Sequence, residues 1–275
     1  MSGLFSTASA VVKDGDGVYA AELATDWAAA GRPHGGYLLA VMARAALAAA
    51  AQSSAGPAAQ PAGPVAPDPL AVSAQFLRPP SAGPATVRTA VRRPGRTVTV
   101  MTATLEQDGR PCVDAVVTCG VLPSGPARWS DLPALAASPP ADAVDVGALP
   151  GSVFGVATVC QLRLDPTTAG FLVGRTDLPP MTRMWVRPAN EPPDPLFALV
   201  AGDISPPVVF NLGSVGWAPT VQLTALLRAR PAPGWLRVQA DCRAVHDRWF
   251  DEDHTVIDST GRLVCQTRQV AIAST

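Results

Sequence analysis

The sequence has no excess of charge of either sign. Lysine and arginine total 21 against 22 aspartate and glutamate residues over 275 positions, which gives a formal net charge of -1. Nucleic acids and anionic lipid surfaces are bound through clustered positive charge, which this composition does not supply. We therefore expect no nucleic-acid partner.

Two reactive sequence patterns are also missing. The five cysteines, at positions 112, 119, 160, 242 and 265, form no CxxC pair. Their odd number and wide spacing favour buried free thiols over a disulfide framework or a zinc site, so we expect a reducing compartment and no metal. The GxSxG pattern that marks the nucleophile of many serine hydrolases does not occur, which argues against that class of enzyme.

The sequence has no leader pattern at its start and no uninterrupted long apolar run. Residues 1–30 carry acidic residues and no basic segment ahead of an apolar run, so we expect no secretory signal and a cytoplasmic location. The longest apolar stretch, residues 36–51, is rich in alanine and interrupted by Arg44. It is shorter than the roughly 20 residues that a membrane span requires, and it predicts a buried helix instead of a span.

The first half contains one long helix pattern followed by strand patterns. Residues 36–52 combine strong helix formers with apolar side chains on nearly every side, which predicts a helix enclosed by other elements. From residue 70 the period changes to two, and residues 97–106 and 112–122 are rich in valine and threonine, as in antiparallel strands. Between them, residues 107–110 (QDGR) predict a tight hairpin, because Asp and Gly tolerate a positive φ.

The two halves of the sequence resemble each other. Residues 80–87 match residues 231–238 in their Pro, Gly and Val positions at an offset of 151. Residues 105–113 (LEQDGRPCV) match residues 257–265 (IDSTGRLVC) at an offset of 152. Chance agreement of the common residues Gly and Pro is the competing explanation. The repeat predicts two copies of one module, each a helix followed by strands that curl around it.

The repeat and the local composition together predict the domain organisation. Residues 123–150 are rich in Pro and Ala, as linkers are. We expect an α+β fold with an N-terminal unit over residues 1–125, a linker over 126–150, a C-terminal unit over 151–275 and a second helix at about 195–212. Edge strands of such sheets tend to pair, which favours a homodimer or a higher homo-oligomer.

Chemistry is expected where one copy carries polar residues that the other lacks. No carboxylate occurs between Asp26 and Asp68, so the first helix offers no general base. In the second helix, Asp203 is the only charged residue of the apolar run 196–203, where burial raises its pKa unless hydrogen bonds offset the effect. Ser205 precedes two prolines, so the helix must break there. The alternative is an Asp at a helix end that is satisfied by backbone amides.

Two further polar residues are specific to the second copy. Thr220 aligns with Pro69 of the first copy, and Gln269, in an otherwise aliphatic run, aligns with Val117. An Asp can accept a proton from water, while a Thr and a Gln can fix the orientation of that water by hydrogen bonds. For Thr220 or Gln269 taken alone, a purely structural role is the competing interpretation.

Six short segments, taken in order, carry a resemblance to a known family. They are RPHGGYLL (32–39), FLRP (76–79), RPGR (93–96), AGD (201–203), WAPT (217–220) and DSTGRLVCQTRQ (258–269). Their order and spacing resemble the acyl-CoA thioesterase II branch of the hotdog superfamily, in its double-hotdog form. The resemblance implies two antiparallel sheets, each wrapped around a central helix and joined into one continuous sheet.

The same resemblance implies a reaction. In the family an Asp, a Thr and a Gln together bind the hydrolytic water, and here they fall on Asp203, Thr220 and Gln269. The implied activity is hydrolysis of an acyl-CoA thioester by direct attack of this water, with no covalent intermediate and no cofactor. After Asp203 the chain continues Ile-Ser-Pro-Pro, unlike better-known members, which leaves the acyl group open.

The resemblance also implies a binding site for the thioester oxygen at the start of the first helix. The residues whose backbone amides would form it are His34, Gly35, Gly36 and Tyr37. A helix N-terminus presents free amides and the positive end of the helix dipole, which suit the oxyanion formed when water attacks a carbonyl. Glycine at these positions would let the substrate approach closely.

Other interpretations stay open. A non-catalytic acyl-thioester binding protein would keep the fold and lack the reaction. A hotdog dehydratase would need a histidine near the central helix, for which His34 is the candidate. The charged segment 246–254 (HDRWFDEDH) contains residue types that bind metals, but we interpret it as a solvated hairpin or loop.

Overall fold

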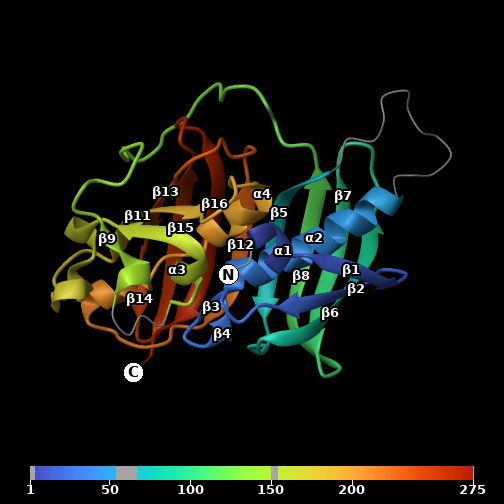
Figure 1. Ribbon diagram of the computed structural model, residues 1–275, viewed down its shortest axis with the longest axis horizontal. Coiled ribbons are helices and arrows are strands. Elements are labelled where there is room, and N and C mark those ends of the chain that lie inside the picture. Colours follow the sequence, from blue (N-terminus) through green and yellow to red (C-terminus); the bar gives the residue numbers. More distant parts are fainter. Residues whose placement is uncertain (1–3, 54–66, 150–153, 275) are drawn as a thin grey trace.

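A single antiparallel sheet of 14 strands dominates residues 4–53, 67–149 and 154–274, which the computed structural model describes (Figure 1). The strands follow the order β1-β2-β6-β7-β8-β5-β12-β16-β15-β13-β11-β10-β9, and β14 pairs with β15 outside this path. Strands from the two halves of the sequence therefore occupy the two halves of the sheet.

The first half of the chain supplies the following elements. They are α1 (Phe5–Ala8), β1 (Val11–Gly15), β2 (Val18–Leu23), β3 (Ala28–Ala29), β4 (Arg32–Pro33), α2 (Gly35–Ser53), β5 (Asp68–Phe76), β6 (Gly83–Arg93), β7 (Thr99–Gln107) and β8 (Arg110–Gly120). Helix α2 packs across β5, β6, β7 and β8, as Figure 1 shows. The short pair β3–β4 leads directly into the start of α2.

The second half supplies a similar set with a much shorter main helix. Its elements are β9 (Val144–Asp145), η1 (Val146–Ala148), α3 (Val156–Val159), β10 (Cys160–Leu164), η2 (Pro166–Thr168), η3 (Gly170–Val173), β11 (Met181–Pro188), α4 (Pro195–Ala201), η4 (Val208–Leu212), β12 (Thr220–Leu227), β13 (Leu236–Asp241), β14 (Val245–His246), β15 (Trp249–Ile257) and β16 (Leu263–Ile272). Helix α4 packs against α2 and against β12, β13, β16 and β5.

The seam between the two halves of the sheet pairs residues that the sequence comparison aligned. Strands β5 and β12 pair antiparallel there, and Ser73 lies directly opposite Thr224. These two residues are separated by 151 positions, the same offset as in the sequence comparison, and their hydroxyl oxygens are 2.9 Å apart. A pair of equivalent residues facing each other is what a pseudo-twofold relation between two copies requires. The pairing of β5 with β12 is therefore in register with the offset found in the sequence.

Helix α2 has the bounds that the sequence predicts to within one residue. Its side chains are buried along most of its length, because α4 and the sheet enclose it. Within the described residues α2 is also the one helix long and apolar enough to cross a membrane, and 61% of that stretch is buried inside the protein. Burial of this kind is typical of the core helix that the sequence predicts.

The second helix is shorter than predicted. Instead of running over 195–212, α4 ends at Ala201, and the chain continues through a turn into the separate 3-10 helix η4. The expected break before Pro206 is present, but helix geometry ends at Ala201, four residues earlier than Ser205, and the Gly202 carbonyl accepts a hydrogen bond from the Thr267 hydroxyl in place of a helix amide. Asp203 therefore lies just beyond the helix and not inside it, which corrects our prediction.

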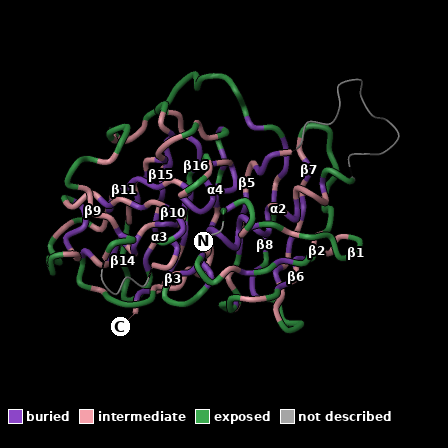
Figure 2. Tube along the Cα trace, in the orientation of Figure 1, coloured by how far each residue is buried: buried purple, intermediate pink, exposed green. Residues whose placement is uncertain are grey.

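One tight hairpin and one long crossing complete the architecture. Asp108 and Gly109 both have positive φ, of 52° and 69°, so the predicted tight turn between β7 and β8 is confirmed. Residues 121–143, all of them described, contain no helix or strand and are mostly exposed. Figure 2 shows this crossing in the exposed colour, while buried residues follow the two main helices and the sheet beneath them.

Candidate active site

The start of α2 lies in direct contact with α4 because it has two glycines. A Cβ atom on Gly36 would lie 2.6 Å from the Leu199 carbonyl oxygen and 2.8 Å from the Val200 Cα. A Cβ atom on Gly35 would lie 2.6 Å from Asp203 Oδ2. All three distances are too short for non-bonded atoms, so no larger residue fits at either position unless neighbouring atoms move. The glycines thus admit the backbone and the acid of the other unit, a role we had assigned to approach of the substrate.

Asp203 is held by groups from both units. Its amide donates to the Val200 carbonyl at 3.0 Å, which keeps it at the end of α4, and its Oδ2 accepts a hydrogen bond from the Gly36 amide at 2.7 Å. The side chain is only 7% exposed. Burial raises its pKa above the usual value, while nearby His34 and the Gly36 amide act in the opposite direction. A carboxylate with a raised pKa is a stronger base as long as it remains ionised.

His34 joins the start of α2 to the acid. Its carbonyl accepts a hydrogen bond from the Leu38 amide, and its own amide donates to the Trp27 carbonyl at 2.9 Å. Its Nε2 donates to the Asp203 carbonyl at 2.9 Å and lies 3.7 Å from Asp203 Oδ2. Within the described residues Nδ1 is buried without a partner. The imidazole thus fastens the end of α4 to the start of α2.

Thr220 and Gln269 come together on two neighbouring strands. Thr220 begins β12 and pairs with Ala271 of β16, two residues beyond Gln269. The Thr220 hydroxyl donates to Gln269 Oε1 at 2.6 Å. Gln269 is 5% exposed, so its amide needs protein or substrate partners in place of bulk water. No direct hydrogen bond joins either residue to Asp203 within the described part of the chain.

One cavity of about 640 Å³ brings most of the predicted site residues together. The predicted residues that line it are His34, Gly35, Asp203, Thr220 and Gln269. Much of its wall is apolar and is formed by Leu38, Phe76, Phe154, Phe210, Trp217 and Phe250. An apolar cavity with a few convergent polar groups is the usual form of a small-molecule site.

The predicted backbone amides do not all remain available. The His34 amide is engaged by Trp27 and the Gly36 amide by Asp203. Tyr37 does not line the cavity, and its hydroxyl donates to the Ala8 carbonyl at 2.6 Å in the core. Gly35 lines the cavity, and its amide has no hydrogen-bond partner within the described residues. This amide is the best placed of the four to meet a substrate oxygen.

Two site residues were missed by the sequence analysis. Glu252 is 2% exposed and lines the cavity, and His254 is 1% exposed, so the interpretation of the charged segment 246–254 as a solvated hairpin or loop is wrong for both. They lie on β15, where alternate residues from Phe250 to Val256 point into the core. The two-residue period was the available signal, because it places an acid and an imidazole among apolar inward positions.

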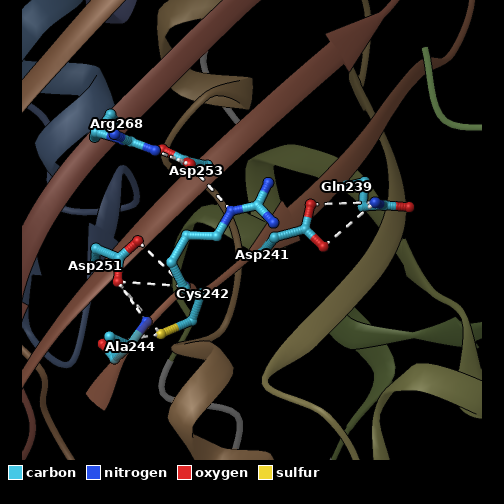
Figure 3. Close-up of polar contacts among 8 residues, drawn as sticks. Gln239, Asp241, Cys242, Ala244, Asp251, Asp253 and Arg268 are labelled. Atoms are coloured by element: carbon cyan, nitrogen blue, oxygen red, sulfur yellow. Dashed lines mark hydrogen bonds and ion pairs between the residues drawn. The ribbon is translucent and has the colours of Figure 1, made fainter. Parts of the chain in front are cut away.

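The neighbouring acids Asp251 and Asp253 point to the other face of the sheet. Asp251 accepts a hydrogen bond from the Ala244 amide at 2.9 Å, and Asp253 pairs with Arg268. Figure 3 shows both carboxylates in this polar cluster beside Cys242. Burial raises the pKa of the Cys242 thiol to about 11, so it is not a thiolate at neutral pH. In the described residues no group of three or more His, Cys, Asp or Glu is placed to hold a metal.

The inward pair of β15 carries strongly shifted pKa values. Burial, together with the nearby Asp203 carboxylate, raises the pKa of Glu252 to about 8, so this acid holds its proton at neutral pH. Burial lowers the pKa of His254 to about 4, so its imidazole is neutral. The Ser205 hydroxyl lies 2.8 Å from His254 Nε2. Glu252 and His254 are therefore polar but uncharged at neutral pH.

Comparison with known proteins places this chain in a family. The acyl-CoA thioesterase N-terminal domain matches residues 23–120, and the acyl-CoA thioesterase C-terminal domain matches residues 128–273. The chain belongs to the acyl-CoA thioesterase family. The family was predicted from the six sequence segments, and that prediction is confirmed.

Relatives of the whole chain agree with this family. An uncharacterized protein of Mycobacterium tuberculosis is 39% identical over 300 residues, covering 99% of each chain. The crystal structure of a candidate thioesterase II from Thermobifida fusca is 32% identical with a TM-score of 0.83, covering 99% of this chain and 100% of that one. A hotdog protein of unknown function from Alicyclobacillus acidocaldarius is 22% identical with a TM-score of 0.78, covering 98% of each chain. The hotdog fold, with one large antiparallel sheet, is thus confirmed.

Proposed function

We propose that this member of the acyl-CoA thioesterase family hydrolyses acyl-CoA thioesters with water activated at Asp203, Thr220 and Gln269. The observation that carries the proposal is the shared cavity, in which a buried carboxylate from one segment faces a hydroxyl and an amide from two strands. The apolar wall suits an acyl chain, and burial of each methylene there contributes about 0.8 kcal/mol to binding.

The geometry supports different roles for the two carboxylate oxygens of Asp203. Its Oδ2 is engaged by the Gly36 amide, while Oδ1 accepts no hydrogen bond within the described residues. Oδ1 is therefore the oxygen that would take the proton of the water. Thr220 and Gln269 already hold each other, which restricts both side chains and fixes the direction from which they would orient this water.

The reaction proceeds in two steps under this proposal. The water oxygen bonds to the thioester carbonyl carbon while Asp203 takes a water proton, and the carbonyl oxygen becomes an oxyanion beside the Gly35 amide. The carbon–sulfur bond then breaks, the carbonyl reforms, and the proton on Asp203 passes to the sulfur of CoA. The products are a free acid and CoA, and no covalent bond to the protein forms.

The finer architecture is part of the same proposal. We take the two halves of the sheet as two hotdog units over 1–125 and 151–275, joined through 126–150, which makes the molecule a double hotdog. The symmetric pairing at Ser73 and Thr224 supports this division. A homodimer or larger assembly and a cytoplasmic location remain predictions.

Release of free thiol from a series of acyl-CoA substrates tests the proposal. Asp203→Asn keeps the size of the side chain and removes the base, so we expect kcat to fall by at least about 100-fold. Asp177→Asn is the matched control, since this exposed aspartate pairs only with Arg175 on the surface and should leave the rate unchanged. Equal rates for wild type and Asp203→Asn would remove Asp203 from the mechanism.

The competing function is binding without turnover. A binding protein would show a melting temperature that rises with acyl-CoA concentration and no thiol release from any chain length. Melting curves recorded on the same samples as the thiol assay separate the two cases. Ligand-dependent stabilisation without any released thiol would replace hydrolysis by acyl-thioester binding.

A further inference from the structure

Glu252 connects three segments that build the cavity. Its Oε1 accepts a hydrogen bond from the Val208 amide at 2.7 Å, which anchors the chain that follows Asp203. Its Oε2 accepts a hydrogen bond from Gln269 Nε2 at 2.5 Å. Gln269 and Glu252 lie directly opposite each other on β16 and β15, so the backbone ladder fixes this contact. Both oxygens of Glu252 are thus used in positioning other groups.

The contact continues from Glu252 to the proposed water-binding residues. The Nε2 atom of Gln269 donates a hydrogen bond to Glu252, and its Oε1 accepts one from the Thr220 hydroxyl at 2.6 Å. A buried amide without a partner at one end could rotate by half a turn, which would exchange its donor and acceptor groups. Glu252 holds the end that Thr220 does not, and so restricts that rotation.

We propose that Glu252 is a positioning residue for hydrolysis, which keeps Gln269 and, through it, Thr220 in the orientation that holds the attacking water against Asp203. The inference rests on the proposed function and extends it beyond the Asp, Thr and Gln that the family resemblance implies. Glu252 acts through Gln269 and the chain after Asp203, so its loss should lower kcat and leave KM nearly unchanged.

The charge state of Glu252 matters because a second carboxylate faces the same cavity. The other charged or titratable groups around it are Asp203 and His34 at the helix junction, His254 on its own strand, and Arg32 and Arg78 in the cavity wall. A neutral Glu252 leaves Asp203 as the one base and adds no charge near the oxyanion. Ionisation of Glu252 would place a negative charge beside Asp203 and beside the oxyanion. The rate of thioester hydrolysis should therefore fall as the pH rises above about 8.

Two substitutions at one position test the inference, with thiol release measured as a function of substrate concentration and pH. Glu252→Leu removes both acceptors, and we expect kcat to fall on the order of 10-fold to 100-fold with KM nearly unchanged. Glu252→Gln keeps the size of the side chain and one of its two acceptor oxygens and cannot ionise, so it should restore part of the kcat that Glu252→Leu loses and should not show the alkaline fall. Asp253→Asn is the matched control, because it lies on the same strand but on the outer face.

The possible outcomes separate this inference from the function on which it rests. An active wild type with an equally active Glu252→Leu variant overturns the positioning role alone. A Glu252→Gln variant as impaired as Glu252→Leu also overturns it, as does an alkaline fall shared by wild type and Glu252→Gln. The comparison of wild type with Glu252→Gln can be made even if Glu252→Leu does not fold. An inactive wild type instead overturns the proposed hydrolysis, and the inference with it.

Discussion

Each main helix precedes one of the two strands that pair at the seam, β5 or β12, but the first turns of the two helices are completed differently. At the start of α4, the carboxylate of Asp194 accepts a hydrogen bond from the Phe197 amide of its own helix at 2.7 Å, and the first turn is buried. At the start of α2 the first turn contains no acidic residue, and the Gly36 amide donates to Asp203 of the other unit at 2.7 Å. One helix is capped from within and the other from across the junction.

The residues nine positions after the two helix caps also differ. Asp203 lies nine residues after Asp194, and the residue nine positions after His34 is Ala43, which is buried. An alanine has no group with which to cap the opposite helix or to hold water. The two halves therefore have similar elements, while the candidate site lies at only one of the two places where a helix start could receive an acid.

The largest effect on this comparison should come from adding a methyl group at the junction. Gly36→Ala places its Cβ against the Leu199 carbonyl, so we expect a loss of about 1–3 kcal/mol in the free energy of unfolding. The displacement of Asp203 should lower thioester hydrolysis on the order of 100-fold. Urea unfolding and thiol release measure the two effects. Gly125→Ala, where a Cβ would meet nothing, is the control, and an unaffected Gly36→Ala would contradict the close contact.

Exchanging the equivalent residues Val117 and Gln269 sharpens the contrast between the copies. Gln269→Val gives the second copy the residue of the first, and kcat should fall by about 10-fold or more because Thr220 and Glu252 lose their shared partner. Val117→Gln buries an amide in the first copy, which should cost about 1–3 kcal/mol of stability without changing the rate. Activity assays and denaturant unfolding check both, and a loss of activity in Val117→Gln at unchanged stability would mean that the position of Val117 also contributes to the site.

The stability of the second copy should depend on pH through Glu252. Its folded pKa of about 8 lies above the usual 4.5, so between these values the unfolded chain has released a proton that the folded chain keeps. Stability is therefore greatest below pH 4.5 as far as this group is concerned, and it falls as the pH rises to 8, by on the order of a few kcal/mol. Glu252→Gln should flatten that part of the curve of unfolding free energy against pH. An unchanged slope would mean that another group is responsible.

The smallest effect should come from the helix start without a site. Asp194→Ala removes the cap of α4 and should cost about 1 kcal/mol in the free energy of unfolding. The rate of thioester hydrolysis should stay the same, because Asp194 does not line the cavity. A clear fall in kcat at unchanged stability would show that both helix starts serve the reaction.

Local patterns predicted much of the fold because local physics determines it. The alternation along β8 and the Asp108-Gly109 turn require only short stretches of sequence, and both are present. The length of α4 could not be obtained in the same way. Its apolar composition continues past Gly202, but the close contact of Gly202 with the Thr267 side chain is a tertiary constraint.

The site was predicted in part, for a related reason. Comparing the copies identified Asp203, Thr220 and Gln269, and these residues do share a cavity. Glu252 was missed because the charges of residues 246–254 were considered as one cluster, whereas the strand sends alternate residues to opposite faces. The bond between Gly36 and Asp203 was missed because it joins residues that are 167 positions apart, and no local pattern records such a contact.

That bond also limits how this molecule can be taken apart. Asp203 and the Gly36 amide that binds it lie in different halves of the chain. A fragment that ends before the crossing at residues 121–143 would therefore contain the amide without the acid. The complementary fragment would contain the acid without the amide. Separated halves could therefore rebuild the constellation only by pairing again across β5 and β12.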